Sequence, residues 1–200
     1  MNILIDKLPT EYKGYKLNTD FRVGIQISSI FSDGMESEED QLDDVIDLLW
    51  GSGVPTTVTD TGIVIDYPLI FETINWFLAC GNPEQKQQKV KDDKELSKDI
   101  PYDFDIDANY IYAAFYQMYG IDLTVTDMHW FKFIALFSSL HDTVFSRIQE
   151  IRTQDPTDFA PGKQRAAAVR QKEAFKIKKL TPEHKAELQA VFGDEWEQHI

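Results

Sequence analysis

Four oxygen-bearing side chains alternate along one short stretch of the chain, in the manner of a calcium-binding loop. They are Asp103, Asp105, Asp107 and Asn109. A calcium loop of this kind needs a glycine at its sharp turn and a bidentate glutamate at its end. Ala108 and Ala114 occupy these two places, so we do not predict a calcium site. We expect the acids to stand at the N-terminal end of a helix, where negative charge is favourable.

The other candidates for chemistry are the single cysteine and two central histidines. Cys80 has no histidine near it in sequence to activate it, so we interpret it as a small buried side chain. His129 and His141 do not have the spacing of zinc ligands, and we expect His129 to be a packed or capping residue. No phosphate-binding glycine-rich loop and no nucleophile elbow occur. We therefore predict a protein that is not an enzyme and needs no metal or cofactor.

The stretch from Asp103 to Leu140 is rich in aromatic residues and predicts two helices joined as an αα-hairpin. Apolar residues recur at helical spacing up to Tyr119, and Gly120 follows where a helix C-cap glycine belongs. Asp127 is of a residue type that caps helix N-termini, so we expect it to cap the second helix. Aromatic side chains bury large areas, so this hairpin should form the core. The side chains expected to be buried against the N-terminal helices are Tyr110, Phe115, Trp130, Phe133 and Phe137.

Capping residues and helix breakers divide the preceding part of the chain into shorter elements. Gly14 lies between two tyrosines and can take the positive φ of a tight turn, which predicts a small N-terminal β-hairpin. N-cap residue types, among them Asp20 and Ser37, followed by apolar stripes predict three helices. These helices cover 21–31, 36–50 and 67–80. Glycines and a proline make 51–65 a variable loop, with a short strand at 63–65. The predicted fold class is therefore mainly α.

Two segments differ in composition from this helical core. Residues 82–100 are rich in Lys, Gln and Asp and poor in apolar side chains, which predicts a mobile linker or a loosely helical insertion. A helix is expected after Thr143, and its inward side chains should be Val144, Phe145, Ile148 and Ile151. Residues 163–179 then carry seven cations against one acid. We predict one helical core domain over 1–155 and a loosely attached, basic helical extension over 156–200.

Charge is distributed unevenly along the chain, whose formal net charge is −14. No Lys or Arg lies between Arg22 and Lys86, and we interpret this part as a solvated acidic face. Binding to phosphate backbones needs clustered cations, so we do not expect nucleic acid as a partner. The basic extension has the opposite charge, which favours contact with its own acidic face or with a neighbouring copy. No apolar run is long enough for a membrane span, and the start is unlike a signal peptide.

Four stretches of the chain carry a resemblance to a known family. They are LNTDFR at 17–22, IDANYIYAAFYQMYGIDL at 106–123, MHWFKFIALFSSL at 128–140 and SRIQEIRTQD at 146–155. By these residues the chain resembles the bacteriophage gene-product-fifteen family of tailed phages and prophages of Gram-positive bacteria. The resemblance covers most of 1–155. The residues that we single out in these motifs and in the core are Asp20, Phe21, Arg22, Tyr110, Ala114, Phe115, Tyr119, Gly120, Asp122, Trp130, Phe133, Phe137 and Arg152.

The resemblance implies a gene located between those of the major tail protein and the tape measure protein. Proteins encoded there are regarded as tail assembly chaperones, which coat the long apolar tape measure protein and later give way to tail tube subunits. The implied partners are the tape measure protein and the tail tube protein. Contact between copies is expected from the charge of the basic extension, and the cytoplasm of the bacterial host is expected from the start of the chain and the lack of a long apolar run. The family brings no catalytic residues with it.

Two other classes of function stay open at this point. One is a structural component of the tail or virion. The other is a small acidic inhibitor of a host nucleic-acid enzyme that imitates the charge of DNA. The long stretch without Lys or Arg supports the inhibitor, whereas the aromatic core and the basic extension argue against it.

Overall fold

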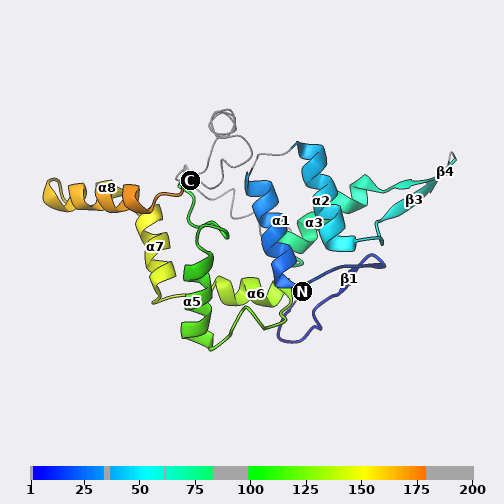
Figure 1. The fold of residues 1–200 in the computed structure, drawn as a ribbon, viewed down its shortest axis with the longest axis horizontal. Helices are drawn as coiled ribbons and strands as arrows, with labels where there is room; N and C mark the ends of the chain where they lie inside the picture. Colours follow the sequence, from blue (N-terminus) through cyan, green and yellow to red (C-terminus); the bar gives the residue numbers. More distant parts are fainter. Residues whose placement is uncertain (1, 34–36, 61, 83–98, 179–200) are drawn as a thin grey trace, which may run out of the picture.

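A computed structural model describes residues 2–33, 37–60, 62–82 and 99–178, and it is mainly helical (Figure 1). These described residues form seven α-helices, namely α1 (Phe21–Asp33), α2 (Glu38–Trp50), α3 (Tyr67–Leu78), α5 (Ala108–Tyr119), α6 (Trp130–Phe137), α7 (Val144–Thr153) and α8 (Lys163–Phe175). A short 3-10 helix, η1 (Pro156–Asp158), joins α7 to α8. The predicted mainly α fold is confirmed. Most of the predicted linker and the end of the basic extension lie outside the described residues. None of the described helices is long and apolar enough to cross a membrane.

Two antiparallel β-hairpins accompany the helices. The first joins β1 (Glu11–Tyr12) to β2 (Tyr15–Lys16) and turns at Gly14, whose φ is +88°, as predicted. The second joins β3 (Thr56–Thr59) to β4 (Gly62–Ile65). The stretch that we predicted as a loop with one short strand therefore contains a complete hairpin.

Side chains fix the points where several helices begin. The Asp20 carboxylate accepts a hydrogen bond from the Arg22 amide at 2.9 Å, at the start of α1. Ser37 caps α2 by accepting from the Asp40 amide at 3.1 Å. Gly120 ends α5 in the left-handed conformation, with φ 65°. These capping predictions are confirmed, because short polar side chains satisfy the free amides of a first turn and glycine tolerates positive φ.

The prediction that Asp127 caps α6 is wrong. The cap is His129, whose Nδ1 accepts from the Phe131 amide at 3.1 Å. His129 itself has an extended backbone and forms an isolated antiparallel bridge with Asp20 of the N-terminal part. The Phe21 amide donates to the Met128 carbonyl and the Trp130 amide donates to the Thr19 carbonyl, both at 2.8 Å. The helix therefore begins at Trp130, the last residue of this pairing, and the expectation that His129 is a packed or capping residue is confirmed.

Phe133 of α6 lies at the centre of the hydrophobic core. Its ring lies 5.0 Å, centroid to centroid, from Phe21 of α1 and 5.0 Å from Phe115 of α5. Trp130 and Phe137, which flank it on α6, are each 5.8 Å away. All five side chains are buried. Packing against the N-terminal helices is confirmed for Phe133, which stacks on Phe21 of α1, and for Trp130, which stacks on Phe77 of α3.

Two side chains predicted as inward-facing are exposed. Tyr110 is 42% exposed, because the buried face of α5 is formed by Ile111, Ala114 and Phe115. Val144 is 63% exposed because it is the first residue of α7 and precedes the first inward position, Phe145. Of the other two side chains predicted to face inward on α7, Ile148 is buried and Ile151 is half-buried.

Candidate functional site

Most of the motif residues hold the fold together. The buried ones are Phe21, Ala114, Phe115, Trp130, Phe133, Phe137 and Arg152. Tyr119 is half-buried, and its hydroxyl donates to the Leu136 carbonyl at 3.0 Å, which joins the end of α5 to α6. These residues therefore explain why the fold forms, and they do not gather into one exposed site.

Arg22 and Asp122 organise the connection between α5 and α6. The Arg22 guanidinium donates to the Leu123 carbonyl at 2.8 Å and to the Thr126 carbonyl at 3.2 Å. The Asp122 carboxylate accepts from the hydroxyl and the amide of Thr124, and these hydrogen bonds hold the pKa of Asp122 below its ordinary value. Arg22 thus anchors α1 to the connection whose shape Asp122 fixes.

Arg152 of α7 makes a buried ion pair with Asp107, the residue before α5. The two side chains are 6% and 0% exposed, and two hydrogen bonds of 2.6 and 2.9 Å join guanidinium to carboxylate. Arg152 also donates to the Phe175 carbonyl at the end of α8, at 2.6 Å. One side chain therefore connects α5, α7 and α8 by charge-assisted hydrogen bonds, which are the strong kind.

The alternating acids of 103–109 are engaged in this local structure. Asp103 is buried, and its carboxylate accepts from the amides of Asp105 and Ile106 at 2.9 and 3.1 Å. Asp107 stands at the N-terminal end of α5 as expected, but its carboxylate serves Arg152 and not the helix amides. Within the described ranges, no group of three or more His, Cys, Asp or Glu side chains could hold a metal ion.

The β3–β4 hairpin exposes an apolar surface, which we call the apolar arm and define as residues 56–65 without Thr61. All its residues are exposed, including Val58 at 81% and Ile63 at 74%. Val58 and Ile63 are directly paired, and Ile65 pairs with Thr56 two positions along. Paired residues of an antiparallel ladder share a face, so Val58, Ile63 and Ile65 form one apolar face. Figure 1 shows the arm projecting away from the helices.

The base of the apolar arm is fixed to the domain. Pro55 is buried, and its carbonyl accepts from the Asp66 amide at 2.9 Å. The Tyr15 hydroxyl donates to the Thr56 carbonyl at 3.1 Å. Two exposed aromatic side chains, Tyr67 and Phe71, follow one helical turn apart on α3. The arm is therefore an apolar surface on an anchored support.

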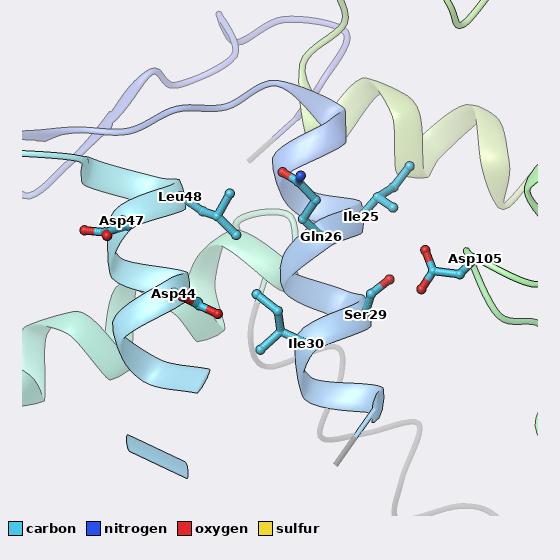
Figure 2. Close-up of a pocket in the computed structure, with 8 residues that line it drawn as sticks. All are labelled: Ile25, Gln26, Ser29, Ile30, Asp44, Asp47, Leu48 and Asp105. Carbon is cyan, nitrogen blue, oxygen red and sulfur yellow. The ribbon is translucent and has the colours of Figure 1, made fainter. Parts of the chain in front are cut away.

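An acidic groove runs along α1 and has a volume of about 550 Å³. Its lining residues are Ile25, Gln26, Ser29 and Ile30 of α1, Asp44, Asp47 and Leu48 of α2, and Asp105 before α5. Ile30 lies between the two helices, whereas Asp105 faces Ser29 on the other side of α1 (Figure 2). No Lys or Arg is among these lining residues. The groove combines an apolar floor with three carboxylates, which suits a partner that carries both small apolar groups and positive charge.

Helix α8 presents the opposite charge at a distance from this groove. Lys163, Ala167, Arg170 and Ala174 are all exposed and recur at helical spacing. The other side of α8 packs inward through Ala168, which is 4% exposed. Lys172 on this inward side binds the Asp99 carboxylate at 2.7 Å. The described part of the basic extension is therefore a docked helix with a basic outer face.

Residues 4–177 match the protein family described as Bacteriophage Gp15 protein. The chain belongs to this family. It is thus a phage-related protein, and the resemblance of its four motifs is confirmed. No curated protein and no solved structure matches the chain.

The family match of this Gp15 protein extends past residue 155 and includes α8. Sequence reasoning missed three features of the family member: the role of Asp107, the acidic groove and the apolar arm. A signal for the arm was present, since Thr56 to Thr59 and Ile63 to Ile65 are mostly β-branched and flank an Asp-Thr-Gly turn. The groove left no comparable signal, because its lining comes from three separate segments.

Proposed function

We propose that this Gp15 protein is a tail assembly chaperone that binds the tape measure protein while the phage tail is being built. The observation that carries the proposal is the apolar arm, where Val58 and Ile63 are about three-quarters exposed on an anchored hairpin. Contiguous apolar surface that faces solvent is typical of a site for another protein. A client with long apolar helices needs such a surface to stay in solution.

The composition of the arm also fits a partner that is held only for a time. Its apolar face is small, and the described residues of the hairpin contain a single charged side chain, Asp60. A small apolar contact gives weak binding for each copy, and many copies along one long client hold it by avidity. Weak individual contacts allow each copy to leave when tail tube subunits arrive.

Co-expression with a tape measure fragment tests the proposal. The fragment should remain in the soluble fraction with the wild-type chain and precipitate with the double variant Val58→Thr/Ile63→Thr. Threonine keeps the β-branched shape and strand preference of both residues, while a hydroxyl group replaces a methyl group of Val58 and the ethyl group of Ile63. The matched control is Val64→Thr, which changes the opposite face of the same hairpin and should retain most of the effect.

Two results would contradict the proposal. An equal soluble yield of the fragment with and without the wild-type chain would remove the chaperone activity. Stoichiometric amounts of the protein in purified phage particles would instead favour a structural component of the tail.

A further inference from the structure

We infer that copies of this chain associate head to tail, with the basic outer face of α8 from one copy lying in the acidic groove of the next. This interaction is separate from the proposed contact between the apolar arm and the tape measure protein, and it requires no client. It involves two surfaces that the core leaves exposed and that carry opposite charge.

The acidic groove has the chemistry of a site for a basic helix. Asp44 and Asp47 lie one helical turn apart on α2, and Asp105 approaches α1 from the other side (Figure 2). None of the three carboxylates has an ion-pair partner among the residues that the structure describes. Ile25 and Ile30 supply apolar contact between them, and the small side chain of Ser29 leaves room for a close approach.

The outer face of α8 matches this groove in charge and in size. Lys163 and Arg170 are two turns apart on that face, about 10 Å along the helix axis. Neither has an ion-pair partner in the described part of the chain. Ala167 and Ala174 lie on the same stripe and keep the helix narrow. A helix of this kind can place two cations beside the carboxylates while its alanines contact the isoleucines.

The occupant is a second copy because α8 is held away from the groove of its own chain. Its inner side is bound through the Lys172–Asp99 ion pair at 2.7 Å and through the Arg152 bond to the Phe175 carbonyl. In Figure 1, α8 extends beyond α7 at one end of the molecule, whereas α1 and α2 lie on the far side of α5 and α7. Docking within one chain would break these contacts, whereas docking between copies preserves them.

The two surfaces differ, so the contact is heterologous. Such a contact leaves each bound copy with one free α8 or one free groove, and it continues as a ring or an open row of subunits. A row would also present one apolar arm for every copy.

Charge-swapped variants of the full chain test the inference by sedimentation velocity at moderate salt. The wild-type chain should self-associate. Asp44→Lys/Asp47→Lys and Lys163→Glu/Arg170→Glu should each weaken association by about tenfold or more, because like charges then face each other. Combining all four substitutions in one chain should restore self-association, because the groove is then basic, the outer face of α8 is acidic, and the two surfaces are again opposite in charge.

A control variant with the same change in net charge as Asp44→Lys/Asp47→Lys distinguishes an effect of the groove from a general effect of charge. Glu11→Lys/Glu150→Lys alters exposed acids outside the groove and should leave association at the wild-type level or above. Circular dichroism of every variant checks that it is folded. A monomeric wild-type chain at concentrations of hundreds of micromolar overturns the inference, and so does a four-fold variant that is folded but does not associate. These outcomes do not depend on the tape measure assay, so the two proposals can fail separately.

Discussion

Gly24 of α1 lies directly against the indole ring of Trp130 at the start of α6. A Cβ atom added at Gly24 would stand 2.2 Å from two atoms of that ring. Trp130 in turn stacks near Phe133, so the close approach of α1 depends on the absence of a side chain at position 24. Glycine here is a packing requirement and not a turn residue.

Gly24→Ala should therefore destabilise the protein, although the same change in an open helix is stabilising by about 0.5–1 kcal/mol. Overpacking of a close-packed core costs about 1–3 kcal/mol, and here the obstacle is a buried ring that has little room to move. Urea unfolding of the variant measures the change. Gly53→Ala is the control, because an added Cβ there meets only one atom, at 3.4 Å. A Gly24 variant as stable as the wild type would contradict the packing role.

The buried Asp107–Arg152 pair gives a second prediction. Arg152→Met leaves the Asp107 carboxylate buried without its cation, and loss of one partner from a buried pair costs about 3–5 kcal/mol. Replacing both partners, in Asp107→Leu/Arg152→Met, should cost less than the sum of the two single changes. A double-mutant cycle from chemical denaturation measures this coupling. Additive single changes would show that the pair does not act as a unit.

The exposed ion pair between Lys13 and Glu72 is the natural comparison for that cycle. Its atoms lie 2.7 Å apart, nearly the same separation, but its side chains are about half exposed. Solvent screens such pairs, so Lys13→Met should change the unfolding midpoint far less than Arg152→Met does.

Phe133 and Tyr110 should respond very differently to truncation. Phe133→Ala removes a fully buried ring from the centre of the core and should cost about 3–5 kcal/mol. Tyr110→Ala alters a residue of α5 that is 42% exposed, and it should cost less than about 1 kcal/mol. Equal costs in denaturant titrations would mean that α5 is turned differently against the core.

His129 should make the stability of the protein depend on pH. Burial lowers the pKa of His129 below its ordinary value of 6.5, despite the hydrogen bond between its Nε2 and the Pro9 carbonyl. The folded protein therefore binds this proton less readily than the unfolded chain does. The contribution of neutral His129 to the free energy of unfolding should be fully present at pH 8, and it should be lost as the pH drops below about 6.5.

Protonation of Nδ1 would also end its role as acceptor for the Phe131 amide. The variant His129→Asn keeps an N-cap side chain without a titrating ring, so it should lose less stability than the wild type between pH 7 and pH 5. Unfolding midpoints of both chains, referred to their values at pH 8, provide the measurement. Parallel pH profiles would exclude His129 as the source.

The sequence predicted those parts of the fold that depend on local pattern. Ser37 and Gly120 mark helix ends through their own hydrogen-bonding and conformational preferences, which act over a few residues. The start of α6 could not be read in this way, because the extended pairing of 128–130 with 19–21 joins parts that are far apart in sequence. Asp127 has the right residue type for a cap, but tertiary pairing decides where the helix begins.

The same distinction applies to the candidate surfaces. The position of Tyr110 depends on how α5 is rotated against its neighbours, which helical periodicity leaves undetermined within about one residue. The acidic groove depends on the side-by-side placement of α1, α2 and the segment before α5. The charge of these elements was visible in the sequence, whereas the hollow between them was not.

The pairing of residues 19–21 with 128–130 also bears on the order of events during synthesis. The Phe21 amide donates to the Met128 carbonyl, and Met128 is synthesised long after Phe21. Helix α1 therefore emerges from the ribosome well before α6 and the residues that precede it. Until α6 has followed, Phe21 has no Phe133 ring to stack against. Contacts between distant parts of a chain form slowly, and uncovered apolar surface is prone to aggregate. The part of the core around Phe133 therefore closes late in translation, and Phe21 of the nascent chain lacks its stacking partner until then.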